Sequence, residues 1–206
     1  MNEKTLTEQE SLAIIQQMIQ FAKQEQRDDG MGWILWGWIL FSASLLTVLN
    51  IHFAWFQTFF FWNIFGLLSI VLLVGTTFKK VISKSKEPVR TYTGDIFDKL
   101  NIGFTITLLL IIVGMNIMGN ARIGFALLTA LYGFWVMIYG ALLNFKPSII
   151  AAYLMWICAL AAMFVPTFLL VMVLHGAAVI IGYVIPGYMA NNEFKKMLGR
   201  QSTKSF

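Results

Sequence analysis

Charge is what this sequence has least of. Asp, Glu, Lys and Arg make up only 12% of its 206 residues, whereas soluble domains carry roughly 25%. Hydrophobic residues make up 58% of the chain, and its mean hydropathy is +0.73. A chain of this length could bury a core, but water could not solvate so apolar a surface. The composition therefore excludes a soluble globular protein and predicts a membrane protein.

Cysteine is nearly absent as well. The single Cys158 excludes an internal disulfide and any CxxC zinc or redox motif. It lies in an apolar run, where a cysteine behaves as a small hydrophobic side chain. The net charge of +5 does not indicate nucleic-acid binding, because the basic residues cluster at the expected membrane edges.

A signal peptide is also missing from the sequence. Residues 1–30 are polar and charged, with no apolar h-region and no small-residue cleavage site. Thr7 and Glu10 instead have the spacing of a capping box, and Ile15 and Ile19 belong to an apolar stripe with helical period. We expect residues 1–30 to form an amphipathic cytosolic or interfacial helix. Its stripe either covers the protein's own bundle or contacts a partner.

Six apolar segments approach the length of about 20 residues that a helical span needs. They are residues 33–51, 55–78, 100–119, 123–144, 148–164 and 168–189. The last two form one nearly unbroken apolar stretch, which we divide at Pro166 because proline disfavours helix at the residue before it. The sequence thus predicts an all-α bundle of six transmembrane helices over residues 31–190. Gly182 and Pro186 predict a kink near the end of the last span.

The distribution of basic residues orients this bundle. Fourteen of the fifteen Lys and Arg residues fall on one side of the predicted membrane, and only Arg122 falls on the other. The positive-inside rule makes the richer side cytoplasmic, so we expect both termini, including a basic tail at 191–206, in the cytoplasm of a bacterial cell with the bundle in its inner membrane.

One predicted cytoplasmic connection is long. It covers residues 79–99, and Pro88 and Gly94 argue against a continuous helix through it. We expect its basic residues to contact anionic lipid or an acidic partner. The residues singled out for this contact are Lys79, Lys80, Lys84, Lys86 and Arg90, and the connection also contains Lys99.

Charged side chains are absent from the predicted spans. All ten Asp and Glu residues lie outside them, as do all Lys and Arg residues. Ion-coupled transporters usually carry an ionisable group within a span, so this absence argues against that class. Neither a protease dyad nor an acidic phosphotransferase cluster is present. We therefore expect a non-enzymatic protein with no metal and no cofactor.

A few uncharged polar residues do lie within the spans. Asn63, Asn116, Tyr132 and His175 all fall in the outer half of the bilayer when helices are counted at about 1.5 Å per residue. Polar groups at one depth can converge, because lipid offers them no partner. Two interpretations stay open: a pocket for a small uncharged or lipid-like molecule, or interhelical hydrogen bonds worth about 0.6 to 2 kcal/mol each.

His175 is the strongest single candidate, because it alone within a span has a side chain that can titrate near neutral pH. It could be a packed neutral histidine that donates to a neighbouring carbonyl. It could instead bind a ligand or sense pH. Haem ligation together with His52 is the third possibility, although no other motif supports it.

Two motifs at the ends of the apolar region carry a family resemblance. A Gly- and Trp-rich segment, GWILWGW at residues 32–38, enters the first span, and GYVIPG at residues 182–187 ends the last. With the polar N-terminal segment, this layout resembles uncharacterised small six-transmembrane-helix bacterial inner-membrane proteins. The resemblance covers most of the chain and implies the six-span fold, but it brings no activity with it.

The sequence gives two functional hypotheses. The first is an accessory or regulatory membrane protein, which contacts a cytosolic or membrane protein partner through its cytoplasmic face and can form homo-oligomers. The second is a carrier or receptor for an uncharged or lipid-like small molecule bound in the outer polar pocket. In both cases membrane lipids surround the protein, and nucleic acid is not a partner.

Overall fold

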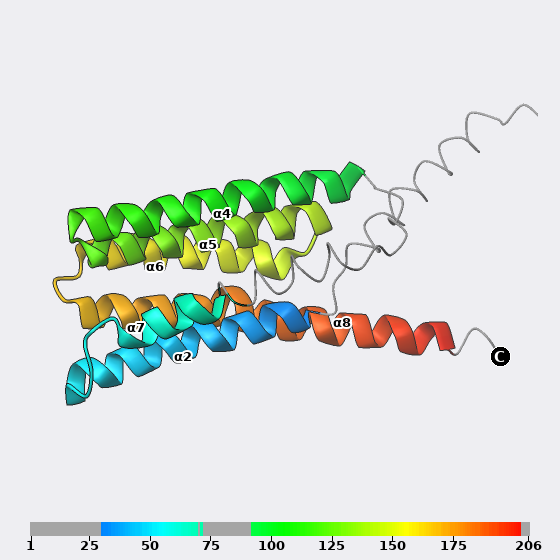
Figure 1. Cartoon of the computed structure of the whole chain (residues 1–206). Helices are drawn as coiled ribbons and strands as arrows, with labels where there is room; N and C mark the ends of the chain where they lie inside the picture. Colours follow the sequence, from blue (N-terminus) through cyan, green and yellow to red (C-terminus); the bar gives the residue numbers. More distant parts are fainter. Residues whose placement is uncertain (1–29, 70, 72–91, 203–206) are drawn as a thin grey trace, which may run out of the picture.

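A computed structural model describes residues 30–69, 71 and 92–202 of the chain, and all regular structure in this part is helical (Figure 1). This confirms the predicted all-α class for the described residues. The expected N-terminal helix with Ile15 and Ile19 lies outside them. So do five of the six basic residues of the long connection, which are Lys79, Lys80, Lys84, Lys86 and Arg90.

In chain order the helices are α2 (Met31–Phe53), a short helix (Phe60–Ser69), α4 (Tyr92–Met118), α5 (Ala121–Leu143), α6 (Lys146–Phe164), α7 (Phe168–Val179), the π-helix η1 (Ile180–Val184) and α8 (Ile185–Ser202). From α4 onwards the helices follow one another with short connections. Five of the described helical segments are long and apolar enough to cross a membrane: Met31–Phe53, Ile96–Met118, Ala121–Leu143, Lys146–Phe164 and Phe168–Lys196. The short helix is apolar but falls below that length.

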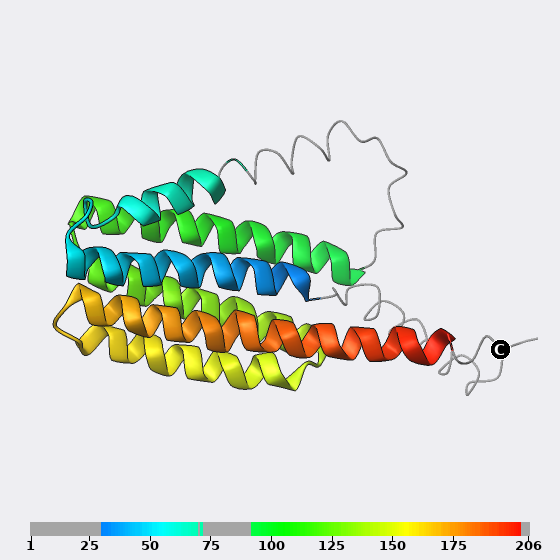
Figure 2. The ribbon, with the colours of Figure 1, turned by 90° about the horizontal axis from the view of Figure 1, so that it is seen from below.

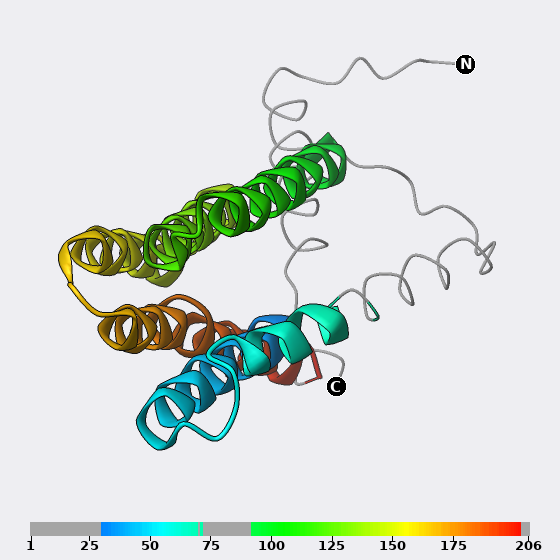
Figure 3. The same cartoon turned by 60° about the vertical axis from the view of Figure 1, so that its left-hand side comes forward.

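The helices form two layers. Helices α4, α5 and α6 make one layer, and α2, α7 and the short helix make the other (Figure 3). The connections at 54–59, 119–120 and 165–167 lie at one end of the bundle. The α5–α6 turn lies at the other end, where α8 extends beyond the neighbouring helices (Figures 1 and 2). Helices joined by these connections therefore run antiparallel, whereas α7, η1 and α8 continue one another in a single direction.

Pro166 separates the last two long apolar segments, as the sequence predicts. Helix α6 ends at Phe164 and α7 begins at Phe168. The Thr167 hydroxyl caps α7 by accepting from the backbone N–H of Leu170 at 3.4 Å. The Arg122 guanidinium donates to the Pro166 carbonyl and so ties this connection to the start of α5.

The start of the second apolar segment differs from its prediction. Its helix begins at Phe60, whereas the sequence predicts a span from residue 55. Asn50 accounts for the difference. Its side-chain amide donates to the carbonyls of Phe56 and Gln57 at 3.1 Å each, and its oxygen accepts from the Phe56 N–H at 2.8 Å. Backbone groups held by a side chain are not available for helical bonding, so residues 54–59 form a connection.

Two further boundaries differ from the prediction. Helix α4 begins at Tyr92 and therefore includes Gly94, which the sequence places in a break. Near the end of a long helix, one glycine costs only about 1 kcal/mol relative to alanine. Helix α8 continues to Ser202, so the predicted tail at 191–206 is helical over most of its length.

A π-helical turn lies where Gly182 and Pro186 predict a kink. The Ile185 N–H bonds to the carbonyl of Ile180, five residues earlier, which widens the turn. Gly182 leaves the space that Met155 of α6 fills, since a Cβ there would collide with the Met155 sulfur. Pro186 has no N–H to donate, so it cannot restore the regular α-helical bond at this point.

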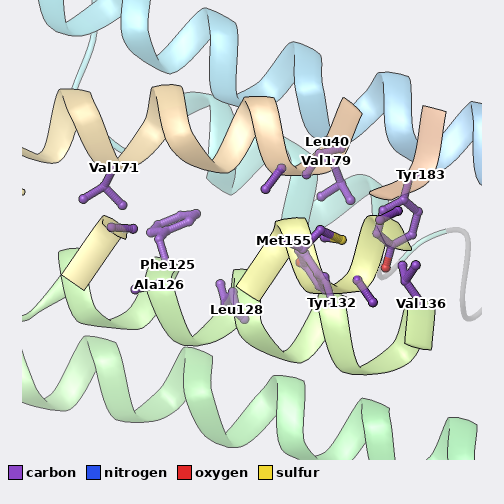
Figure 4. Packing of buried hydrophobic residues seen from close by; sticks show 14 of the residues in the cluster. Leu40, Phe125, Ala126, Leu128, Tyr132, Val136, Met155, Val171, Val179 and Tyr183 are labelled. Carbon is purple, nitrogen blue, oxygen red and sulfur yellow. The ribbon is translucent and has the colours of Figure 1, made fainter. Parts of the chain in front are cut away.

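The core lies between the two layers. Figure 4 shows side chains of α5, such as Phe125 and Val136, facing Val171 and Val179 of α7 across the interior. Helix α2 completes this packing at Gly37. A Cβ at that position would lie 2.8 Å from the Val184 side chain, so only glycine allows this close approach.

Candidate functional site

His175 lies in the middle of the core. Its side chain is 1% exposed, and its Nδ1 is 2.7 Å from the Thr129 hydroxyl oxygen of α5. The Thr129 hydroxyl also lies 2.8 Å from the Phe125 carbonyl in its own helix. The imidazole therefore joins the two layers through a hydroxyl group, where one sequence interpretation expected a carbonyl.

Aromatic rings surround His175 on several sides. The centroids of Trp62, Phe125 and Tyr132 lie 5.5, 5.6 and 5.7 Å from that of the imidazole. Further ring contacts continue from this cluster in both directions along the bundle, through Phe168 and Phe59 on one side and through Tyr183, Trp33 and Tyr139 on the other. The imidazole is thus held in a column of apolar rings.

Two nitrogens in this cluster lack a hydrogen-bond partner. They are Nε2 of His175 and the indole Nε1 of Trp62, both of which are buried. Among the described residues only the Ser148 hydroxyl shares this condition. Leaving a buried polar group unsatisfied costs about 1 to 3 kcal/mol, and native structures rarely accept this cost. Two such nitrogens on adjacent rings make this cluster the candidate site among the described residues.

The structure brings together only two of the four polar residues singled out in the sequence. Tyr132 and His175 are buried side by side. Asn63 is exposed on the short helix. Asn116 is also exposed, and its side chain donates to the Ile112 carbonyl of its own helix at 2.7 Å. The described site is therefore smaller and more aromatic than the predicted pocket.

Two members of the site are not obvious from the sequence. Thr129 is a residue type whose hydroxyl commonly bonds its own helix, so it gives no sign of a partner on another helix. Trp62 looks like one of many apolar aromatics, although its indole N–H is a hydrogen-bond donor. The predicted depth in the membrane could have pointed to Thr129 and Trp62, because both lie in the same half of the bundle as His175.

Two other buried polar residues, Ser44 and Thr47, form hydrogen bonds to the backbone of their own helix, α2. The hydroxyls of Ser44 and Thr47 donate to carbonyls four residues earlier, at 3.0 and 2.7 Å. Their small side chains form the surface on which α7 packs, since a Cβ at Gly176 would lie 3.5 Å from the Ser44 Cβ. These residues serve helix packing and leave no polar atom free for a ligand.

The described residues contain no group of three or more His, Cys, Asp and Glu side chains that could hold a metal ion. His52 is exposed at the C-terminal end of α2, where its ring packs on Phe53 with centroids 4.9 Å apart. The histidine pair considered for haem thus has one exposed and one fully buried member.

No protein-family model, curated protein or solved structure matches this chain. The chemistry of the site is therefore argued from its own residues.

Proposed function

We propose that this protein is a carrier or receptor for a small uncharged molecule, which binds beside His175 and Trp62. The observation that carries the proposal is the pair of buried, unpartnered nitrogens on adjacent rings. One bound polar group would satisfy both. The sequence alone ranks an accessory role first, and this pair of nitrogens reverses the order.

The proposed ligand is uncharged because nothing at the site would compensate a charge. The rings around His175 are Trp62, Phe125 and Tyr132, and the hydrogen-bonded neighbour is a hydroxyl. Burying a charge without a counter-charge costs far more than a few hydrogen bonds return. The aromatic walls suit an apolar body with one polar group, which is also the character of a lipid-like molecule.

The proposed membrane arrangement has six spans in a bacterial inner membrane, with both termini cytoplasmic. Five described helical segments reach membrane-spanning length, and the short helix Phe60–Ser69 lies within the predicted second span. Helical segments that are joined by a described connection run antiparallel, as a series of crossings requires (Figure 2). In this arrangement the unpartnered nitrogens lie in the outer half of the bilayer.

Access from the lipid is consistent with the position of Trp62. This residue is half-buried on the short helix, most of whose other side chains are exposed. The cluster is closed around His175, whose Nε2 has no contact with solvent. In this proposal, rotation of the Trp62 side chain admits the ligand from the side of the bundle.

Native mass spectrometry on protein gently extracted from its own membrane tests the proposal. We expect wild-type protein to retain a small molecule, and Trp62→Phe and His175→Ala to retain about tenfold less, since each removes one of the two polar contacts along with some packing. Trp62→Phe keeps an aromatic ring, so the loss cannot be assigned to a missing side chain alone.

Asn116→Ala is the matched control. It removes a polar side chain from the predicted pocket that the structure places on the exposed face of α4, so ligand retention should match that of wild type. Wild-type protein with no retained molecule would contradict the carrier or receptor function. Equal retention by wild type and both site variants would contradict the assigned position.

An accessory role is the second candidate, and α8 favours it. This helix extends beyond its neighbours at the proposed cytoplasmic end (Figure 1), and Lys195 and Lys196 on it are exposed. Exposed lysines on such a helix can contact an acidic protein surface. Removal of these two charges tests the candidate through co-purification of a partner.

A further inference from the structure

We infer that the site recognises a hydroxyl group, and that Thr129 sets this specificity by fixing which nitrogen of His175 carries the proton. The inference rests on the proposed function, because it names the chemistry of the ligand at the same site. It follows from counting the protons available to Phe125, Thr129, His175 and Trp62.

The count begins at the Phe125 carbonyl, which can only accept. The Thr129 hydroxyl has one proton and donates it to that carbonyl at 2.8 Å. The 2.7 Å contact between Thr129 and His175 then requires the imidazole to donate from Nδ1. The reverse assignment, with Thr129 donating to Nδ1, makes one hydrogen bond in place of two and is disfavoured.

A neutral imidazole protonated at Nδ1 has a bare lone pair at Nε2. The unpartnered nitrogen of His175 is therefore an acceptor, whereas that of Trp62 is a donor. A ligand must accept from the indole and donate to the imidazole. The two ring centroids are only 5.5 Å apart, and a hydroxyl performs both tasks with a single oxygen atom. A ketone or ether oxygen can only accept, so it leaves Nε2 unsatisfied.

Because Thr129 fixes the proton on Nδ1, a substitution at this position should change which functional group the site prefers. Replacement by Val keeps a similar shape but removes the oxygen that accepts from Nδ1. The proton is then free to move to Nε2, which becomes a second donor beside the Trp62 N–H. Two donors suit a carbonyl oxygen, which accepts from both, better than a hydroxyl.

The test uses the full chain labelled with ¹⁵N-histidine. The label reports on two residues, His52 and His175, which are the two histidines of the sequence. The probes are 1-hexanol, 2-hexanone and hexanamide, and ¹⁵N NMR reads the protonation pattern and the ligand-induced shift of Nε2. In wild type we expect a proton on Nδ1 and a saturable Nε2 shift with 1-hexanol. The alcohol should bind about fivefold more tightly than the ketone, which is the value of one neutral hydrogen bond.

Three variants complete the test. Thr129→Val should lose or invert the preference for the alcohol, whereas Thr129→Ser keeps the oxygen and should retain it. Trp62→Phe leaves Thr129 intact and keeps the inference testable if Thr129→Val does not fold. It should weaken 1-hexanol binding about fivefold while the alcohol still shifts Nε2.

The failures of the two proposals are distinguishable. A wild-type proton on Nε2, or ketone or amide binding as tight as that of the alcohol, would overturn the hydroxyl specificity and leave ligand binding standing. If no probe gives a saturable shift and native mass spectrometry finds no retained molecule, the proposed function falls with the inference.

Discussion

At the scale of single residues, Asn50 shows how one side chain can end a helix. Its amide and oxygen hold backbone groups of Phe56 and Gln57, and it is 1% exposed. The next residues after α2 include Ala54 with a left-handed φ of 52°. The three hydrogen bonds therefore hold a turn that has a conformational cost of its own.

We expect Asn50→Ala to lower the free energy of unfolding by about 2 kcal/mol, because it removes three hydrogen bonds whose exposed partners water can partly satisfy. Reversible denaturation in mixed micelles, followed by tryptophan fluorescence, measures the change. Asn116→Ala is the control and should change stability by less than about 0.5 kcal/mol, as is usual for exposed positions. Equal stability of the two variants would show that Asn50 does not hold the turn.

The sequence identifies His175 and its neighbour Tyr132, but not Thr129 or Trp62. A histidine in an apolar segment stands out by residue type, whereas Thr129 and Trp62 acquire their roles from neighbours on other helices. The same limit explains Asn116, which looks equivalent to His175 in depth but lies on the outer face of α4. The depth of a side chain in the membrane can be counted from the sequence. Whether it faces the core or the outside depends on how the helices pack.

At the scale of helices, the sequence predicts breaks better than it predicts ends. Pro166 marks the division between α6 and α7 because its ring acts locally on the residue before it. The start of the short helix was predicted too early, since Asn50 acts from the preceding helix. The site of η1 is visible in Gly182 and Pro186, but the sequence does not show that Met155 of α6 packs against Gly182.

Helix α8 carries the prediction for the accessory role. Replacing both Lys195 and Lys196 with Gln removes two exposed positive charges and keeps side chains that favour helix. If α8 contacts an acidic partner, co-purification of that partner should fall severalfold, and the effect should weaken at high salt. Lys146→Gln is the control, because Lys146 is exposed at the start of α6, next to the α5–α6 turn at the same end of the bundle. If the Lys195 and Lys196 double variant co-purifies as much partner as the Lys146→Gln control, the contact is rejected.

At the scale of the whole molecule, the charge distribution suggests an orientation but not the arrangement of helices. Periodicity does not say which helices are neighbours, and only the structure shows that α2 packs on α7 at the far end of the sequence. It also places α4 at an edge, where it packs on α5 and exposes side chains such as Ile117 and Met118. Helices of similar composition thus occupy very different positions.

The proposed orientation predicts which positions a membrane-impermeant maleimide reaches. In a Cys158→Ala background, a cysteine at Thr58 should react in intact spheroplasts, because this exposed residue lies in the 54–59 connection at the proposed outer end. A cysteine at Asn192, exposed on α8, should react only after the membrane is opened. Labelling of Asn192 in intact spheroplasts would contradict a cytoplasmic C-terminus.

The contact between α2 and α7 has a consequence for biosynthesis. The first of these helices is complete at Phe53, and the second begins at Phe168. At about 5 to 20 residues per second, translation needs on the order of ten seconds to cover that interval. During this time the face of α2 that contains Gly37 contacts lipid or an insertion factor. Because His175 belongs to α7, the nascent chain can form its aromatic cluster only after α7 has been synthesised.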